Sequence, residues 1–189
     1  CIGVTLHTIA GYQMENAAIA VRALEMLPQA KEITREQISS GLGKAFWPGR
    51  MEEILPEVFA DGAHNADGIR AFLDAVRTDG CDTIGKHRML LFSVVQDKEY
   101  DVMIKQVMDA ALFERIYVPH MGTSRAAELS ELKQLWERKP GNGTEIIFCE
   151  DVRGAMEQAL ASQNGARIYI AGSLYLVGEI KEFLKNDQF

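Results

Sequence analysis

The sequence has no apolar run long enough to cross a bilayer and no signal-peptide pattern. Cysteine is scarce, and the three cysteines, at positions 1, 81 and 149, are too widely spaced to predict a disulfide framework or a zinc site. Basic residues are outnumbered, with 20 Lys and Arg against 27 Asp and Glu, and the net charge of -7 argues against a nucleic-acid surface. We therefore expect a protein of the reducing cytoplasm that contacts neither membranes nor nucleic acid.

Motifs for several common chemistries are also missing. A Walker phosphate loop requires Ser or Thr after its Gly-Lys pair, but Ala45 follows Gly43-Lys44. Neither a Gly-x-Gly-x-x-Gly dinucleotide fingerprint nor a Gly-x-Ser-x-Gly nucleophile turn occurs. The four histidines, at positions 7, 64, 87 and 120, include no pair with metal-ligand spacing. The sequence therefore predicts no triphosphate cradle, no NAD site and no metal held by this chain alone.

What the sequence does contain is a regular alternation of strands and helices after residue 57. Short apolar runs predict strands at 58–60, 88–95, 115–119, 145–149 and 167–171. Helical spacing of apolar residues predicts helices at 65–77, 100–112, 128–137, 152–163 and 174–184. Residues 51–56 are expected to add an edge strand that is a candidate for antiparallel pairing. This rhythm is typical of an α/β fold with a mostly parallel sheet of about six strands and helices on both faces.

The first 45 residues follow a different, helical pattern. A helix is expected over 12–27, because apolar residues recur at helical spacing and Pro28 follows. Thr34 and Gln37 predict a capping box for a second helix. We therefore place a domain boundary near residue 45, with a helical segment over 1–45 and the α/β domain over 46–189. Since the chain starts at Cys1 rather than at a methionine, we expect it to be a piece of a longer protein.

Polar residues follow two of the predicted strands. Asp61 and His64 come after the strand at 58–60, and Ser173 follows the strand at 167–171. Parallel sheets bind ligands at the carboxyl ends of their strands, so these side chains are candidates for a binding site. Asp61 suits hydrogen bonds from a sugar diol, and His64 suits donation to a phosphate or carboxylate. The alternative is that Asp61 and Asn65 only organise the strand-to-helix turn, with His64 on the surface.

Two of the candidates suit anions. Arg50 follows a Pro-Gly pair, and a guanidinium binds phosphate or carboxylate in a bidentate manner. The alternative for Arg50 is a salt bridge to Glu52 or Glu53. Ser173 is expected to cap the helix after it, at a place where exposed N–H groups can also hold a carboxylate.

A further candidate lies on the first predicted helix. Gln13 and Asn16 are about one turn apart, so they share a face. An amide both donates and accepts hydrogen bonds and can therefore read an adenine edge. The alternative is an ordinary solvated helix surface.

Three motifs together carry a resemblance to a known family. They are H-T-I-A-G-Y-Q-M-E-N at 7–16, W-P-G-R-M-E at 47–52 followed by D-G-A-H-N at 61–65, and A-G-S-L-Y-L-V-G-E at 171–179. In this order they resemble the folylpolyglutamate synthase and dihydrofolate synthase enzymes of the Mur ligase superfamily. Over residues 98–165 only the alternation of strands and helices matches.

The resemblance implies an ATP-dependent ligase that adds L-glutamate to folate or dihydropteroate through an acyl phosphate. By this resemblance Asn16 would contact the adenine of ATP, Arg50 its phosphates, and Asp61 the ribose or a phosphate-linked partner. His64 would be the catalytic residue, near the reacting carboxylate and the incoming glutamate, and Ser173 would help to bind that glutamate.

In enzymes of this family the phosphate loop and the Mg2+ ligands lie in an N-terminal ATPase domain, which has no counterpart in this sequence. The resemblance therefore implies that residues 1–45 are the helical tail of that domain and the linker. Residues 46–189 would be a C-terminal glutamate ligase domain with Rossmann-like topology, monomeric and inactive without its ATPase domain. Two alternatives stay open: a Mur-type cell-wall amino-acid ligase, which the motif at 171–179 disfavours, and a non-catalytic small-molecule binding module. The choice between dihydropteroate and folates also stays open.

Overall fold

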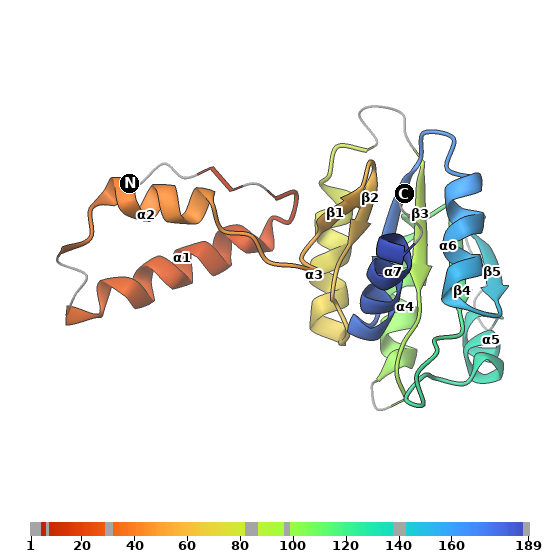
Figure 1. The fold of residues 1–189 in the computed structure, drawn as a ribbon. Coiled ribbons are helices and arrows are strands. Elements are labelled where there is room, and N and C mark those ends of the chain that lie inside the picture. The colour runs from red at the N-terminus through yellow and green to blue at the C-terminus, as the bar shows by residue number, and fades with distance from the viewer. Residues whose placement is uncertain are drawn as a thin grey trace. The chain divides into compact units, whose positions relative to one another are not determined.

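The computed structural model describes residues 5–6, 8–28, 32–81, 87–96, 99–137 and 143–186. The chain divides into two compact units, Cys1–Pro48 and Gly49–Phe189 (Figure 1). In these described ranges, no helix is both long enough and apolar enough to span a membrane.

The first unit is helical in its described part, with α1 (Tyr12–Glu25) and α2 (Arg35–Gly43). The predicted capping box is confirmed, because the Gln37 N–H donates to Thr34 Oγ1 at 3.2 Å and the Thr34 N–H donates to Gln37 Oε1 at 2.8 Å. No residue of either helix is buried. Capping therefore defines where α2 begins, while neither helix contributes to a core within the described unit.

The second unit is built on a sheet whose six strands, among the described residues, follow the order β1-β2-β6-β3-β4-β5. The strands are β1 (Glu52–Leu55), β2 (Val58–Ala60), β3 (Arg88–Phe92), β4 (Arg115–Pro119), β5 (Glu145–Cys149) and β6 (Arg167–Ala171). Neighbouring strands are parallel except β1 and β2, which are antiparallel. The predicted α/β fold, with a mostly parallel sheet and an antiparallel edge strand, is confirmed.

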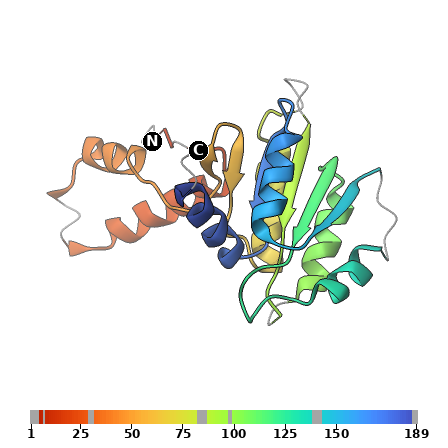
Figure 2. The ribbon, with the colours of Figure 1, turned by 45° about the vertical axis from the view of Figure 1, so that its right-hand side comes forward.

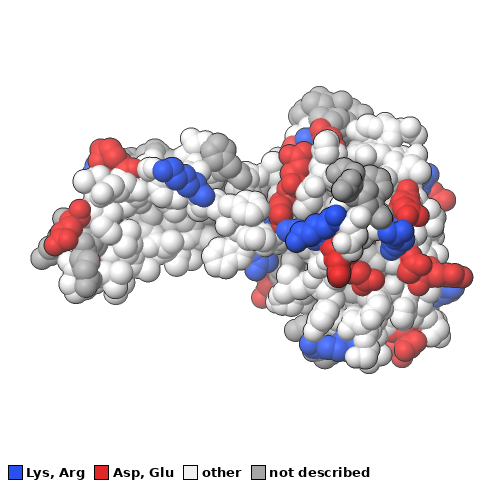
Figure 3. Space-filling model, viewed as in Figure 1, with Lys and Arg blue, Asp and Glu red and all other residues white. Residues whose placement is uncertain are grey.

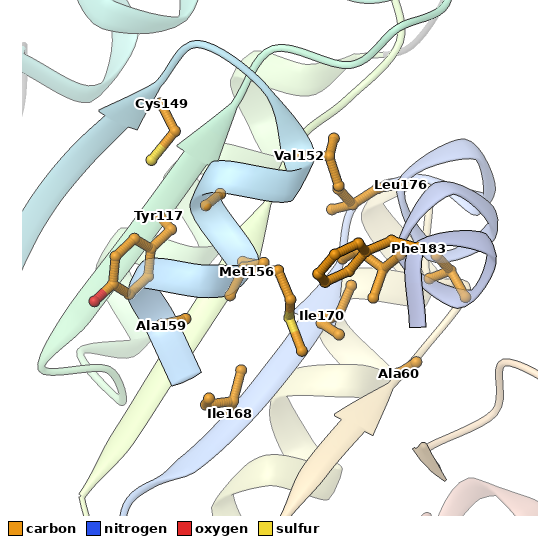
Figure 4. Packing of buried hydrophobic residues seen from close by; sticks show 14 of the residues in the cluster. Ala60, Tyr117, Cys149, Val152, Met156, Ala159, Ile168, Ile170, Leu176 and Phe183 are labelled. Carbon is orange, nitrogen blue, oxygen red and sulfur yellow. The ribbon is translucent and has the colours of Figure 1, made fainter. Parts of the chain in front are cut away.

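Helices cover both faces of this sheet (Figure 2). One face carries α3 (Ala66–Arg77), α4 (Tyr100–Ala110) and α5 (Leu129–Glu137), and the other carries α6 (Val152–Ala161) and α7 (Leu174–Asn186). Strand residues alternate between the faces: Ile168 and Ile170 join the core under α6 and α7, whereas Tyr169 contacts Phe72 of α3. Figure 4 shows the core under α6 and α7, where Met156 and Phe183 lie near Ile170. Burial on both faces explains why the strands read as continuous apolar runs.

β3 ends at Phe92, although its apolar run predicted a strand to residue 95. Beyond Phe92 the backbone bonds to a different segment. The Ala127 N–H donates to Val94 O at 3.0 Å, and the Gln96 N–H donates to Arg125 O at 2.9 Å. Because the segment is buried in this arrangement too, its apolar character could not reveal where the sheet ends.

A buried ion-pair network lies at the amino ends of β3 and β6. The Asp79 side chain is 0% exposed and accepts hydrogen bonds from Arg88 Nη2 at 3.0 Å and from the Tyr169 hydroxyl. Arg167 donates to the Asp79 carbonyl at 2.8 Å and to Glu57 Oε2 at 2.6 Å. Burial acts to lower the pKa of Arg167, but the hydrogen bond with Glu57 and the charges of Glu57 and Asp79 outweigh it and raise that pKa. The network ties the loop after α3 to the sheet.

Candidate functional site

The turns after β2 (residues 61–65, the β2 turn) and after β6 (residues 172–173, the β6 turn) lie side by side, because β2 and β6 are parallel neighbours. The Asp61 N–H donates to Ile170 O at 2.9 Å, and the Gly172 N–H donates to Ala63 O at 2.9 Å. The two turns, which carry most of the predicted site residues, are therefore bonded to each other at the carboxyl edge of the sheet.

Asp61 also joins a third segment, residues 48–51, which we call the Arg50 turn. The carboxylate is buried, its Oδ1 accepts the Ala63 N–H at 2.8 Å, and its Oδ2 accepts the Met51 N–H at 3.0 Å. A buried carboxylate with backbone donors on both oxygens organises the chain around it. The geometry thus supports the organising role that the sequence left open for Asp61.

The Arg50 turn has an unusual backbone. Gly49 (φ +68) and Met51 (φ 46) both lie in the left-handed region, which a non-glycine residue such as Met51 rarely adopts. The Gly62 N–H donates to Gly49 O at 2.7 Å. A Cβ at Gly62 would lie 2.6 Å from Leu174 Cδ2 and 3.3 Å from Gly49 O. Position 62 therefore favours glycine, because the β2 turn, the Arg50 turn and the start of α7 approach closely there.

The Arg50 side chain is exposed and forms no ion pair with another described residue. Glu52 pairs instead with Lys181 at 2.8 Å, and Glu53 Oε1 accepts the Glu57 N–H at 3.1 Å. The alternative salt bridge from Arg50 to Glu52 or Glu53 is therefore not formed. An exposed guanidinium on a tethered turn is suited to an anionic ligand.

His64 is half-buried, and its Nδ1 lies 2.7 Å from Gly62 O. A carbonyl oxygen only accepts, so Nδ1 carries the proton and Nε2 is the ring atom that can accept from a ligand. The next residue, Asn65, caps α3, since its Oδ1 accepts the Gly68 N–H at 2.7 Å. The predicted cap is confirmed, and it sets the N-terminal end of α3 beside His64.

Ser173 is only 1% exposed, and its Oγ accepts the Tyr175 N–H at 3.1 Å, so the predicted cap of α7 is confirmed. The preceding Gly172 has φ +105, and a Cβ there would lie 2.5 Å from Ser93 O. Glycine thus lets the chain pass close to the end of β3. Because the Ser173 hydroxyl is buried, a ligand at this end of α7 would be met chiefly by backbone N–H groups.

Asn16 lies in the first unit. It is exposed on α1, and its Nδ2 donates to Gln13 Oε1 at 2.8 Å. This bond confirms that Asn16 and Gln13 share a helix face. The structure therefore brings together four of the predicted site residues, at positions 50, 61, 64 and 173, and leaves Asn16 in a separate unit.

Sequence reasoning missed Lys181, and it considered Glu52 only as a partner of Arg50. Lys181 Nζ donates to both Glu52 carboxylate oxygens at 2.8 Å, and Glu52 Oε2 accepts the Gly49 N–H at 2.7 Å. A signal was present in the spacing of Ser173, Val177 and Lys181. Their i, i+4, i+8 pattern places them on one face of α7, in line with the Arg50 turn.

The bonded turns combine a guanidinium and the N-terminal ends of α3 and α7, which suit anionic ligands, with an imidazole whose Nε2 can accept a hydrogen bond. In the described part of the chain, no group of three or more His, Cys, Asp or Glu could hold a metal ion. On the face of the second unit seen in Figure 3, acidic and basic side chains are interspersed.

Comparison with known proteins gives a consistent result. The family described as Mur ligase, glutamate ligase domain matches residues 49–174. The dihydrofolate synthase/folylpolyglutamate synthase of Bacillus subtilis is 31% identical over 188 residues, which cover 94% of this chain and 40% of that protein. The chain thus spans about two fifths of the length of this protein and of the folylpolyglutamate synthase of Lacticaseibacillus casei.

Solved structures show the same fold. Mycobacterium tuberculosis folylpolyglutamate synthase complexed with ADP superposes with a TM-score of 0.78 at 21% identity, covering 98% of this chain and 42% of that one. Folylpolyglutamate synthase from Thermotoga maritima superposes with a TM-score of 0.72 at 26% identity, covering 96% of this chain and 40% of that one. With the family match over most of its length, the chain belongs to the Mur ligase family, as a glutamate ligase domain related to the folylpolyglutamate and dihydrofolate synthases.

Proposed function

We propose that this chain is the C-terminal part of an ATP-dependent ligase that adds L-glutamate to folate or dihydropteroate. The names of the curated relatives and the ADP complex of the Mycobacterium tuberculosis enzyme support this activity. One observation carries it here: the Arg50 turn is hydrogen-bonded to the β2 turn, and the β2 turn to the β6 turn. These bonds group a guanidinium and a helix N-terminus, which can stabilise developing negative charge, with an imidazole that can accept a proton.

The chemistry explains why these groups belong together. A carboxylate is a poor acyl donor because its leaving group would be oxide, so the folate carboxylate is first phosphorylated by ATP. The amine of glutamate then attacks the acyl phosphate and displaces inorganic phosphate. Arg50 would neutralise negative charge as it develops on the phosphate oxygens. ATP and Mg2+ would be held chiefly by the N-terminal ATPase domain of the longer enzyme.

His64 and the β6 turn would act on the glutamate side. With Nδ1 held by Gly62 O, Nε2 of His64 can accept a hydrogen bond or a proton from the incoming amine. Ser173 would help to bind glutamate by fixing the start of α7 through its bond with the Tyr175 N–H, so that the remaining N–H groups there can meet a glutamate carboxylate. Asp61 would serve the nucleotide by ordering the Arg50 turn beside the ribose and the phosphates.

The first unit would belong to the ATPase side of the enzyme. Residues 1–45 would form the helical tail of the ATPase domain with the linker, and Asn16 on α1 would contact the adenine. The complete enzyme would be a monomer. In this arrangement the second unit supplies the glutamate-binding groups together with Arg50 for the phosphates, and it cannot turn over alone.

Activity assays test this proposal. The purified 189-residue chain should bind ATP weakly and should add no glutamate, whereas the full-length enzyme should release ADP only when both glutamate and a folate or dihydropteroate are present. ATP-dependent glutamate addition by the 189-residue chain would contradict the division of labour. Ligation to a nucleotide-linked cell-wall precursor, or binding without ligation by the full-length enzyme, would reject the folate assignment.

Arg50→Ala in the full-length enzyme tests the role of the guanidinium. Removal of a charge-stabilising donor should lower kcat/KM by about 2–4 kcal/mol of transition-state stabilisation, which corresponds to roughly 30- to 1000-fold. Arg70→Ala is a matched control, because Arg70 is exposed on α3 and its one ion pair among the described residues is with Asp67. Wild-type kinetics in Arg50→Ala would reject the role assigned to Arg50.

A further inference from the structure

Glu52 links the Arg50 turn to a helix that is distant in sequence. Its side chain is 12% exposed, and both of its oxygens accept hydrogen bonds from Lys181 Nζ at 2.8 Å. Glu52 Oε2 also accepts the Gly49 N–H at 2.7 Å. One carboxylate therefore binds the backbone immediately before Arg50 and a side chain of α7.

The Arg50 turn depends on such tethers. The Gly49 N–H is held by Glu52, the Gly49 carbonyl by the Gly62 N–H, and the Met51 N–H by Asp61. Met51 has φ 46, a conformation that a non-glycine residue keeps only when its surroundings impose it. Arg50 lies between two residues that are each fixed by hydrogen bonds, so its position follows from theirs.

The partner of Glu52 lies on the helix that begins at the β6 turn. Ser173, Val177 and Lys181 are spaced i, i+4 and i+8, and the middle residue lies against the Arg50 turn, since Val177 Cγ1 is 4.0 Å from the position a Cβ would take at Gly49. The face of α7 that starts at Ser173 thus ends at the Lys181–Glu52 pair. The single helix α7 therefore connects the β6 turn, assigned to glutamate binding, with the Arg50 turn, assigned to phosphate binding.

We propose that Glu52, held in place by Lys181, is a positioning residue for Arg50, and that α7 thereby keeps the Arg50 turn in register with the β6 turn. The inference rests on the proposed function, in which Arg50 contacts the phosphates of ATP. Glu52 touches no substrate; it acts through the Gly49 N–H. Misplacing a substrate-binding group by about 1 Å can lower a rate by about a hundredfold, so loss of this contact is expected to be visible in catalysis.

A measurement on the 189-residue chain tests the positioning directly. In Glu52→Ala, amide hydrogen exchange at Gly49 and Arg50 should become at least about tenfold faster, because the Gly49 N–H loses its acceptor. Glu57→Gln is the matched control: Glu57 pairs with Arg167 at 2.6 Å and is also partly buried, but it lies at the amino end of β6. Unchanged exchange at Gly49 in Glu52→Ala would overturn the inference.

Kinetics of the full-length enzyme separate positioning from folding. Glu52→Ala should raise KM for ATP or lower kcat/KM for ATP by about 10- to 100-fold, while KM for glutamate stays within about twofold. Glu52→Gln should recover most of the loss, because its amide oxygen can still accept the Gly49 N–H. The loss of kcat/KM for ATP in Lys181→Met should be intermediate between the losses in Glu52→Ala and Glu52→Gln. Equal losses for both substrates, or no recovery in Glu52→Gln, would indicate a structural role only and overturn the inference.

A double-mutant cycle separates this inference from the proposed function. If Glu52 acts through Arg50, Glu52→Ala should have little further effect in the Arg50→Ala background. If kcat/KM falls in Arg50→Ala and falls further by the full Glu52→Ala effect in the double mutant, the inference is overturned and the proposed function stands. Unchanged kinetics in Arg50→Ala would overturn both.

Discussion

Replacement of Asp61 by alanine tests whether the three turns are held together as the structure shows. The Asp61 carboxylate is buried and accepts the Ala63 N–H at 2.8 Å and the Met51 N–H at 3.0 Å. A hydrogen bond to a charged group contributes about 1.5–3 kcal/mol, and a buried N–H left without an acceptor is penalised on a similar scale. Since both bonds are lost together, we expect Asp61→Ala to lower the free energy of unfolding by about 3 kcal/mol, the lower end of their summed contribution.

Urea denaturation followed by circular dichroism measures this loss. With a slope of about 2 kcal/mol per molar urea, the midpoint should fall by about 1.5 M. Asp61→Asn should show a smaller fall, because its single carbonyl oxygen can serve one of the two N–H groups. Asp74→Ala is the matched control, since Asp74 is exposed on α3 and pairs with Arg77, and its midpoint should shift by no more than about 0.3 M. If Asp61→Ala unfolds together with this control, the carboxylate does not organise the turns and the reasoning fails.

Three further changes test other parts of the structure by thermal or urea unfolding. Gly172→Ala should lower the free energy of unfolding by at least about 2 kcal/mol, because its Cβ would lie 2.5 Å from Ser93 O and the residue has φ +105. Gly178→Ala is the control: Gly178 lies on α7 with open space around it, so the change should be neutral or stabilising by about 0.5–1 kcal/mol. Equal effects at the two glycines would contradict the close approach at the β6 turn. Asp79→Ala should destabilise by about 3–5 kcal/mol, because it removes the buried carboxylate that accepts hydrogen bonds from Arg88 and the Tyr169 hydroxyl, and a change below about 1 kcal/mol would show that the network is dispensable. Burial raises the pKa of the Cys149 thiol above its usual range, so the folded chain keeps that proton at a pH where the unfolded chain has released it. The free energy of unfolding should therefore fall as pH rises above about 8.5, and this fall should be smaller in Cys149→Ala. An identical alkaline fall in Cys149→Ala would assign it to other groups.

Most of the strands and most of their limits follow from local properties of the sequence, the end of β3 being the exception. The predicted strands at 58–60, 115–119, 145–149 and 167–171 coincide with β2, β4, β5 and β6. A strand buried on both faces needs a continuous apolar run, and polar residues must follow where the chain leaves the core, whatever the order of the strands. Capping by Thr34, Asn65 and Ser173 was likewise readable, because a cap bonds within its own turn.

The candidate residues of the bonded turns were predicted one by one, but their contacts were not. Asp61 and Ser173 come close only because β6 lies beside β2 in the strand order, which is a result of long-range packing. The pairing of Lys181 with Glu52 joins residues 129 positions apart, and the left-handed backbone at Met51 is imposed by bonds from other segments. Periodicity in a sequence reports burial at each position, since burial is a local demand. It does not report which distant segments meet, because many strand orders satisfy the same apolar pattern, and only the packed structure selects one of them.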